Sequence, residues 1–344
     1  MFCRGCEKCI LTSKNQKYII MIIKINFMKS DLFLILLIVA LGHFACTTRQ
    51  EIPPKLVIDD GWWQVAGNPD MGEYTTEGQE PVDFAIWQAA DGTWQIWSCV
   101  RKTSAPGKTR IFYHWEGQNL TDKNWEPKGF PFLADTTLGE MLNGLQAPYV
   151  IQKQGTYYMF YGDWNQICLA KSTDGKNFER VIRNGNAALF GDEKMTRDPM
   201  VVTDQDKYYC YYTANPNDKG AIYLRTSSDM FNWSDSRMVA FGGQAGEKFW
   251  HAECPFVVQH PAGWNYLFRT QSYGPGLKGD PAKKQKTSLY ASRDLVDFGI
   301  NDDAKLVDTL EVAAPEVFEH EGQYYMAALM PDLQGIRITK LHWQ

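Results

Sequence analysis

Short apolar segments, rather than long amphipathic stretches, make up most of this chain. Runs rich in Val, Ile, Tyr, Phe and Trp alternate with clusters of Gly, Asp, Asn and Pro, and few stretches show a helical period of 3.6 residues. Such runs predict many short β-strands joined by tight turns. Residues 157–161 and 208–212 are clear examples, and Asp91-Gly92 is a typical turn of a β-hairpin.

One pattern of these strands occurs five times along the chain. Each copy has two or three apolar residues, usually opened by Pro, then a polar turn with Gly or Asp, and then an aromatic strand. The equivalent positions, 51 to 64 residues apart, are Phe84, Pro148, Pro199, Pro255 and Pro315. Repeats of this length built from four strands are blades of a β-propeller. We therefore predict an all-β fold over residues 46–344, a five-bladed β-propeller with four-stranded antiparallel blades.

A second repeated element supports this fold. In three copies, a Ser-x-Asp turn follows the next strand and leads to an aromatic residue four positions after the Asp. The three pairs of Asp and aromatic residue are Asp174 and Phe178, Asp229 and Trp233, and Asp294 and Phe298. Because both elements repeat together, the pattern favours a propeller over a β-sandwich whose hairpins are similar by chance.

The N-terminal segment differs from this pattern. Residues 32–41 form an apolar run, and Ala45-Cys46 follows it closely. This order is typical of an export signal with a lipoprotein site, and the run is short for a membrane-spanning helix. We expect an extension upstream of the true start over 1–27 and a lipoprotein signal peptide over 28–45, with a lipid on Cys46. The mature protein would be an exported lipoprotein that faces the periplasm or the cell surface and touches the membrane only through this lipid anchor.

Charge and aromatic content narrow the class of partner. The formal net charge is −5, and the propeller sequence has no block of Lys and Arg, whereas phosphate binding needs a concentrated basic face. The 12 Trp and 17 Tyr include rings that suit stacking on sugars, although most are expected to pack between sheets. The sequence therefore predicts a monomer that binds an oligo- or polysaccharide and no nucleic acid.

Three of the five copies carry a carboxylate at or beside the same position: Asp83, Asp198 and Glu253. The inner strand of each blade lines the central channel, so these acids are expected to converge on one funnel. Converging acids raise one another's proton affinity, and glycoside hydrolysis needs one protonated and one ionised carboxyl group. Two alternatives stay open: Glu80 is a second candidate for the base, and Glu253 is also explained by a structural ion pair with Arg197.

In these motifs the chain resembles the five-bladed propeller glycosidases of glycoside hydrolase families 43 and 32. The order Asp83, Asp198, Glu253, with gaps of 115 and 55 residues, is similar to family 43, which is inverting. This resemblance implies that Asp83 is the general base and Glu253 the general acid. It also implies that Asp198 tunes the protonation of the acid and orients it.

Other strings are similar to family 32, which is retaining and acts on fructosides. They are Arg197-Asp198-Pro199 and Glu253-Cys254-Pro255. That family has its first acid, the nucleophile, in an Asn-Asp-Pro-Asn string, where this chain has Val82-Asp83-Phe84-Ala85. This departure favours family 43 and leaves the role of Asp83 open.

The position of further residues near the funnel makes them candidates for substrate binding. They are Arg197, Trp63, Gln146, Trp250, His251 and Arg269, of which Trp63 is also a candidate for an N-terminal strand that closes the propeller. No ligand cluster demands a metal, so no metal site and no required cofactor are predicted, and a central divalent cation is compatible with the resemblance. We expect an inverting glycosidase that cleaves arabinofuranosides or xylosides. The alternatives are a fructan-type retaining glycosidase and a carbohydrate-binding propeller lipoprotein without catalysis.

Overall fold

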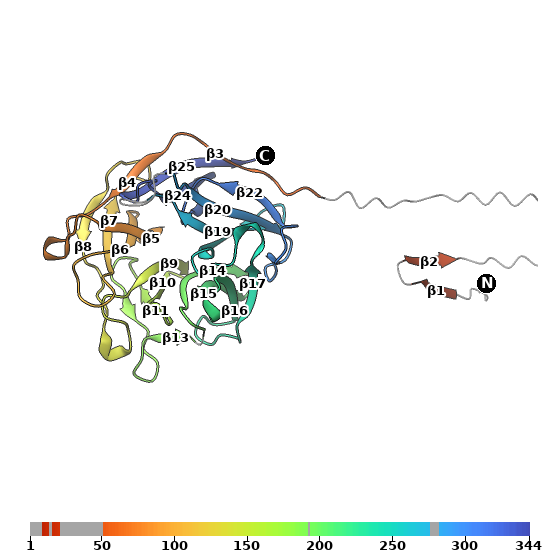
Figure 1. Ribbon diagram of the computed structural model, residues 1–344, viewed down its shortest axis with the longest axis horizontal. Coiled ribbons are helices and arrows are strands. Elements are labelled where there is room, and N and C mark those ends of the chain that lie inside the picture. Colours follow the sequence, from red (N-terminus) through yellow and green to blue (C-terminus); the bar gives the residue numbers. More distant parts are fainter. Residues whose placement is uncertain (1–8, 14–15, 21–50, 192, 276–281) are drawn as a thin grey trace, which may run out of the picture. The chain divides into compact units, whose positions relative to one another are not determined.

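The chain divides into two units, Met1–Glu51 and Ile52–Gln344, in a computed structural model (Figure 1). The described residues are 9–13, 16–20, 51–191, 193–275 and 282–344. Within the first unit, β1 (Cys9–Ser13) and β2 (Gln16–Ile20) pair as an antiparallel hairpin. The predicted signal peptide and Cys46 lie outside the described residues. No helix among the described residues is long and apolar enough to cross a membrane.

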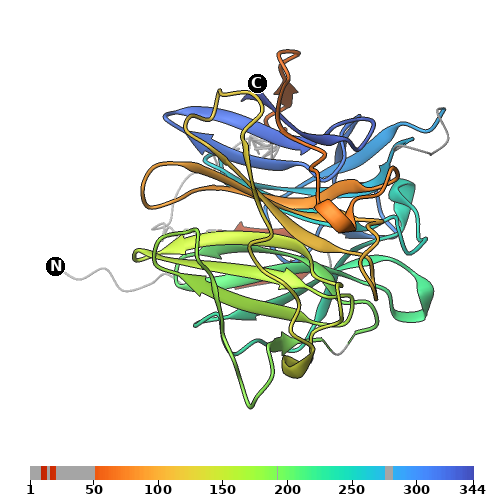
Figure 2. The same cartoon turned by 90° about the vertical axis from the view of Figure 1, so that its left-hand side faces the viewer.

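The second unit contains five antiparallel sheets arranged around a centre (Figure 1 and Figure 2). Blade one has β5 (Glu80–Gln88), β6 (Trp94–Arg101), β7 (Ile111–Gly117) and β8 (Glu126–Gly129). Blade two has β9 (Gln146–Lys153), β10 (Thr156–Gly162), β11 (Ile167–Ser172) and β12 (Glu179–Arg180), with β13 (Ala188–Phe190) also paired to β11. Blade three has β14 (Arg197–Asp204), β15 (Lys207–Ala214), β16 (Ala221–Ser227) and β17 (Arg237–Phe241). Blade four has β18 (Glu253–His260), β19 (Trp264–Tyr273), β20 (Gln285–Ser292) and β22 (Leu306–Leu310).

Blade five joins the two ends of the second unit. Its strands β23 (Glu316–His320), β24 (Gln323–Leu329) and β25 (Gly335–Trp343) come from the C-terminal part of the chain. The N-terminal strands β3 (Leu56–Ile58) and β4 (Trp63–Gly67) then pair with β25. Of the two roles considered for Trp63, the structure confirms the closing strand. The predicted all-β, five-bladed propeller is confirmed as well.

Short elements lie between blades and, in the case of η3 (Pro216–Asp218), between two strands of blade three. The strand β21 (Gly299–Ile300) leaves blade four and pairs in parallel with β17 of blade three. The short 3₁₀ helices are η1 (Gly72–Tyr74), η2 (Thr136–Leu138), η3 (Pro216–Asp218) and η4 (Gly243–Ala245).

The core lies between the blades, and the aromatic residue after each Ser-x-Asp turn packs on the preceding blade. Phe178 of blade two contacts Trp87 of blade one, with ring centroids 5.9 Å apart. Phe298 of blade four contacts Tyr211 of blade three at 6.1 Å. The repeated element therefore joins blades one and two, and blades three and four, through aromatic contacts.

Candidate active site

Each blade has one residue in the left-handed region of backbone conformation near the start of its inner strand. The φ angles are 45° for Asp83, 48° for Ala147, 56° for Asp198, 44° for Cys254 and 47° for Ala314. The pairing of β5, β14 and β18 shifts at this point, and such a bulge redirects side chains next to a site. The five residues are thus equivalent, and the residue of blade four at this position is Cys254. Glu253 precedes it by one residue.

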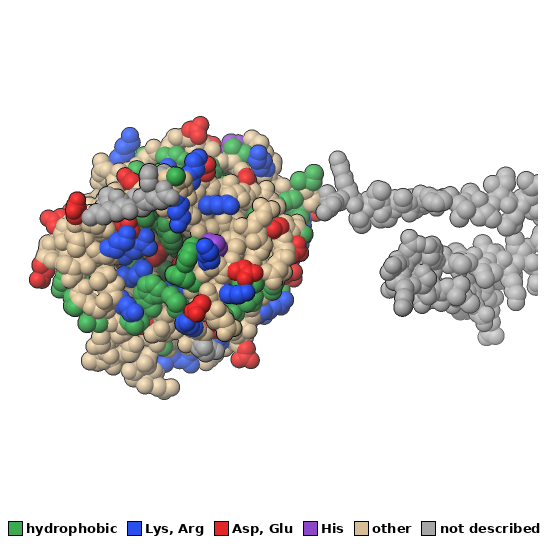
Figure 3. Space-filling model, in the orientation of Figure 1, with side chains coloured by type: hydrophobic (Ala, Val, Ile, Leu, Met, Phe, Trp, Pro, Cys, Tyr) green, Lys and Arg blue, Asp and Glu red, His purple; other side chains and the backbone are tan. Residues whose placement is uncertain are grey.

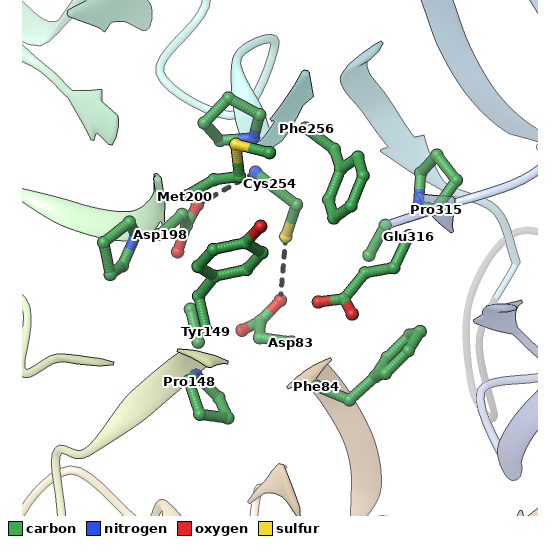
Figure 4. Close-up of a pocket in the computed structure, with 14 residues that line it drawn as sticks. Asp83, Phe84, Pro148, Tyr149, Asp198, Met200, Cys254, Phe256, Pro315 and Glu316 are labelled. Atoms are coloured by element: carbon green, nitrogen blue, oxygen red, sulfur yellow. Dashed lines mark hydrogen bonds between the residues drawn. The ribbon is translucent and has the colours of Figure 1, made fainter. Parts of the chain in front are cut away.

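These positions line a narrow cavity at the centre of the propeller (Figure 4). Asp83, Asp198 and Cys254 lie on its wall together with Tyr149 and Glu316, and the carboxyl groups of Asp83 and Glu316 point toward one another. The cavity volume of about 30 Å³ matches one water molecule rather than a sugar ring. The cavity itself is therefore too small to hold a sugar ring.

Asp83 is buried and held by three side chains. Tyr273 donates its hydroxyl to Asp83 Oδ1 at 2.8 Å, and the Cys254 thiol lies 3.3 Å from the same oxygen. Arg110 Nη1 lies 3.5 Å from Oδ2. Tyr273 and Arg110 were missed in the sequence because neither belongs to the repeated motif. These contacts fix the carboxylate in one orientation and give it a positive neighbour.

Asp198 is the most enclosed of the three acids. Its Oδ2 accepts the Thr213 hydroxyl at 3.1 Å and the backbone N–H of Cys254 at 3.1 Å. Burial raises the pKa of Asp198 well above its usual range, and the charges of Glu253 and Asp83 add to this rise although Arg197 opposes it. Asp198 therefore retains its proton more readily than an ordinary Asp.

Glu253 is held by Arg197 in a bidentate ion pair. Nη2 of Arg197 lies 2.6 Å from Oε1 of Glu253, and Nε lies 3.2 Å from Oε2. Arg197 also donates to the carbonyl of Met195 and to Asn215 Oδ1, so the guanidinium itself is fixed. The sequence predicted Arg197 as a substrate-binding residue. In the structure its Nε and Nη2 instead bind Glu253 and orient that side chain. Arg197 also lies 3.8 Å from Asp198, so it links Asp198 and Glu253. Cys254 connects Asp198 to Asp83 through its N–H and its thiol.

Glu80, the second candidate for the base, lies in a different environment. Its side chain is only 1% exposed, with Arg101 Nε at 2.9 Å and Lys102 Nζ at 2.7 Å from its two oxygens. Burial opposes ionisation, but Lys102 and Arg101 prevail and lower the pKa of Glu80. Glu80 thus takes part in an ion-pair cluster, whereas Asp83 lies in the central ring.

Two of the predicted substrate-binding residues have a buried polar atom without a hydrogen-bond partner among the described residues. Gln146 precedes the left-handed residue of blade two as Glu253 does in blade four, and its buried Nε2 has no hydrogen-bond partner among the described residues. The buried Nδ1 of His251 likewise has none within the described part of the chain. Trp250 is 38% exposed and packs edge to face on His251. Trp250 therefore presents an exposed aromatic ring, whereas the two nitrogens are enclosed.

Two other predicted substrate-binding residues are not brought to the funnel. The indole N–H of Trp63 donates to the carbonyl of Leu120 at 3.2 Å, and its ring packs edge to face on Tyr325 of blade five. Arg269 is buried and donates to the carbonyls of His251, Gly242 and Gly246. Its guanidinium therefore secures a loop and is not available to a substrate.

Trp164 was also missed in the sequence. It lies in the loop between β10 and β11, and the guanidinium groups of Arg110 and Arg197 lie 4.5 Å and 5.9 Å from its ring centre. Its φ of 80° is rare for an aromatic residue and is often found at functional sites. The buried Nε1 has no partner among the described residues. The only sign of Trp164 in the sequence is a Trp in the polar loop that follows an aromatic strand.

Among the described residues, no group of three or more His, Cys, Asp or Glu side chains is arranged to hold a metal ion.

Comparisons with known proteins agree with this architecture. Residues 86–274 match the model of the glycosyl hydrolases family 32 N-terminal domain. A thermostable family-43 glycoside hydrolase has a similar structure, with 17% identity, a TM-score of 0.56, and coverage of 81% of this chain and 92% of that chain. An exo-1,5-α-L-arabinanase from a bovine ruminal metagenomic library has 14% identity and a TM-score of 0.53, covering 76% of this chain and 92% of its own.

A Bombyx mori GH32 β-fructofuranosidase in complex with sucrose is similar as well, with 18% identity and a TM-score of 0.54. The alignment covers 81% of this chain and 62% of that chain. None of the curated proteins matches the sequence. At these identities the solved structures show a shared fold, whereas the family model covers more than half of the 344 residues. The chain therefore belongs to the family of the glycosyl hydrolases family 32 N-terminal domain and is a glycoside hydrolase.

Proposed function

We propose that the protein is an exported glycosidase that cleaves arabinofuranosides or xylosides at the mouth of the funnel. One observation carries the proposal: Asp83, Asp198 and Glu253 share one network but differ in their surroundings. Asp83 is hydrogen-bonded at the central cavity, Asp198 is buried with a raised pKa, and Glu253 is oriented by Arg197. The similar structures named as an arabinanase and a β-xylosidase support the choice of sugar.

In the proposed reaction, Asp83 is the base and Glu253 the acid. Asp83 takes a proton from a water molecule whose oxygen forms the new bond to the anomeric carbon. The bond between this carbon and the leaving oxygen breaks, and Glu253 gives its proton to that oxygen. Asp198 has the raised pKa and shares Arg197 with Glu253, so it controls the charge beside the acid. This mechanism inverts the anomeric configuration.

A retaining fructofuranosidase is the second candidate, and the family 32 match favours it. Asp198 and Glu253 lie inside the matched residues, and Asp83 lies just before them. In this mechanism Asp83 attacks the anomeric carbon directly, and water then hydrolyses the covalent intermediate. NMR of the first product formed from aryl arabinofuranoside, xyloside and fructofuranoside substrates separates the two candidates. A product of inverted configuration excludes the retaining mechanism.

The assignment of the acid is tested by Glu253→Gln. Because the amide cannot protonate the leaving oxygen, we expect kcat on natural glycosides to fall by about 10²–10⁴-fold while the circular dichroism spectrum stays unchanged. Glu247→Gln is a matched control, since Glu247 forms a surface ion pair with Lys219 and should keep full activity. Wild-type turnover in Glu253→Gln would falsify the role of Glu253.

Export through a lipid on Cys46 is part of the proposal and rests on the N-terminal sequence. In cells, Cys46→Ser should move the protein out of the membrane fraction and block incorporation of labelled fatty acid. Labelling that persists in the variant contradicts the lipid anchor.

A further inference from the structure

A second pocket lies beside the funnel. It has a volume of about 330 Å³ and is lined by residues of blades one and four, with Leu333 from the turn of blade five. This volume is within the usual range for small-molecule sites, about 300–1,000 Å³. Trp250 forms part of its wall, and this ring is exposed enough to contact a sugar face.

The pocket is rich in positive charge. Among the described residues, Arg101, Lys102 and Lys283 line it together with one carboxylate, that of Glu80, although the whole chain has a net charge of −5. Figure 3 shows Lys and Arg side chains gathered around the hollow at the centre of this face. Neutralising one carboxylate requires one cation, so the excess charge points to an anionic ligand.

One of these cations, Arg101, is held in a fixed position by Glu80. Glu80 and Arg101 face one another in the pairing of β5 with β6, and Arg101 Nε is bound to Glu80 at 2.9 Å. Nη1 and Nη2 of Arg101 make no other hydrogen bond within the described part of the chain. With the guanidinium held by its inner nitrogen and 23% of the side chain exposed, its outer fork suits a carboxylate or sulfate.

The pocket is connected to the funnel through Tyr273. This residue lines the pocket, its ring lies 5.3 Å from the Arg101 guanidinium, and its hydroxyl donates to Asp83. A sugar in the pocket would thus lie next to one bound above Asp83, as two adjacent units of one glycan do.

We propose that this pocket is a subsite for a sugar unit that carries an anionic group, a carboxylate or a sulfate ester, next to the unit that is cleaved. The proposal rests on the proposed glycosidase function and specifies its substrate as an acidic glycan. Arg101 and Lys283 bind the anion, and Trp250 contacts the sugar ring.

Calorimetry at low ionic strength on the wild-type protein tests the subsite without any turnover. The probes are methyl β-D-glucuronide against methyl β-D-glucoside, and glucose 6-sulfate against glucose. We expect at least one anionic probe to bind about tenfold or more tightly than its neutral partner, with the preference decreasing as salt is added. A preference for the glucuronide over the glucoside indicates a carboxylate, and a preference for glucose 6-sulfate over glucose indicates a sulfate ester. Equal affinities within both pairs of probes overturn the proposal.

Variants then locate the binding. Lys283→Gln should weaken the preferred anionic probe about three- to tenfold, and Arg101→Lys should weaken it further because the planar fork is lost. Lys284→Gln is the matched control, since Lys284 pairs with Glu311 outside the pocket and should bind as wild type does. An anion preference that survives both pocket variants places the anion elsewhere and overturns the subsite. If the protein hydrolyses neutral glycosides but shows no preference for anionic probes, the subsite is wrong and the glycosidase function stands. If it binds anionic probes but hydrolyses no glycoside, the subsite stands and the glycosidase function is wrong.

Discussion

A single backbone conformation recurs at the centre of each blade, and the side chain placed there decides what that blade contributes. Ala147 and Ala314 contribute only a small side chain to the ring, whereas Asp83 and Asp198 contribute carboxylates and Cys254 a thiol. Cys254 also bridges the acids, because its N–H binds Asp198 and its sulfur contacts Asp83. The same local geometry therefore provides scaffold in two blades and chemistry in three.

The burial of Asp198 predicts a stability cost that depends on pH. Its pKa is higher in the folded than in the unfolded protein, so its contribution to stability is complete below the unfolded pKa, about 3.9. The contribution is lost as the pH rises toward the folded pKa. In Asp198→Asn the amide oxygen still accepts the N–H of Cys254, and the side chain does not ionise. The variant therefore avoids the loss of folding stability that ionisation of Asp198 causes as the pH rises. We expect the variant to melt roughly 2 °C or more above wild type at pH 7, with a smaller difference at pH 4.

Differential scanning fluorimetry at both pH values measures this effect. Asp206→Asn is a suitable control, because this exposed residue lies in a turn of the same blade, and its change in Tm should be the same at both pH values. A Tm difference between Asp198→Asn and wild type that does not change with pH contradicts the assigned burial cost. Asp198→Asn should also lose activity, because active sites commonly keep a charged residue that lowers the stability of the fold.

At the scale of elements, the turn with its aromatic residue is the device that joins blades. In blade three, Asp229 Oδ1 accepts the N–H groups of Phe231 and Asn232 at 2.8 Å, and these hydrogen bonds lower the pKa of Asp229. The turn so fixed directs Trp233 onto Phe160 of blade two, with ring centroids 6.0 Å apart. Blades one, two and three thus each receive an aromatic residue from the following blade.

Removing one of these aromatic residues should weaken the whole propeller. Phe298 is fully buried between blades three and four, so Phe298→Ala should lower the free energy of unfolding by about 3–5 kcal/mol. Val296→Ala, in the same turn but only half-buried, should cost much less. Chemical denaturation followed by tryptophan fluorescence compares them, and equal costs would mean that the contact between blades is not what stabilises this element.

The sequence predicted elements well where they repeat and poorly where a contact is unique. Five copies of one pattern define a blade, since hydrophobic alternation and turn chemistry are local properties. The bulge between Glu253 and Phe256, where Cys254 rather than Glu253 lines the central cavity, leaves no local signal. Tyr273, Arg110 and Trp164 reach the site through contacts between distant parts of the chain, which a single sequence does not reveal.

At the scale of the whole molecule, one closure keeps the five blades in a ring. The strands β3 and β4 are the outer strands of blade five, whose other strands come from the opposite end of the sequence. Val65 and Ala66 of β4 are fully buried, and Trp125 N donates to the carbonyl of Val65 at 2.6 Å. The closing strands therefore bind both blade five and blade one, on which the position of Asp83 depends.

Loss of these strands should affect stability and catalysis together. A variant that begins at residue 68 lacks β3 and β4, which exposes the edge of β25 and removes buried apolar surface. We expect it to melt at least about 10 °C below a variant that begins at residue 52, or not to fold, since several kcal/mol are lost and each shifts Tm by about 2–4 °C. Thermal denaturation measures the difference, and glycoside hydrolysis by the longer variant confirms that its site is intact. Equal melting temperatures would mean that the ring closes without its N-terminal strands. In that case the inner strands of blades one and four, which carry Asp83 and Glu253, would be held in place by contacts between neighbouring blades alone.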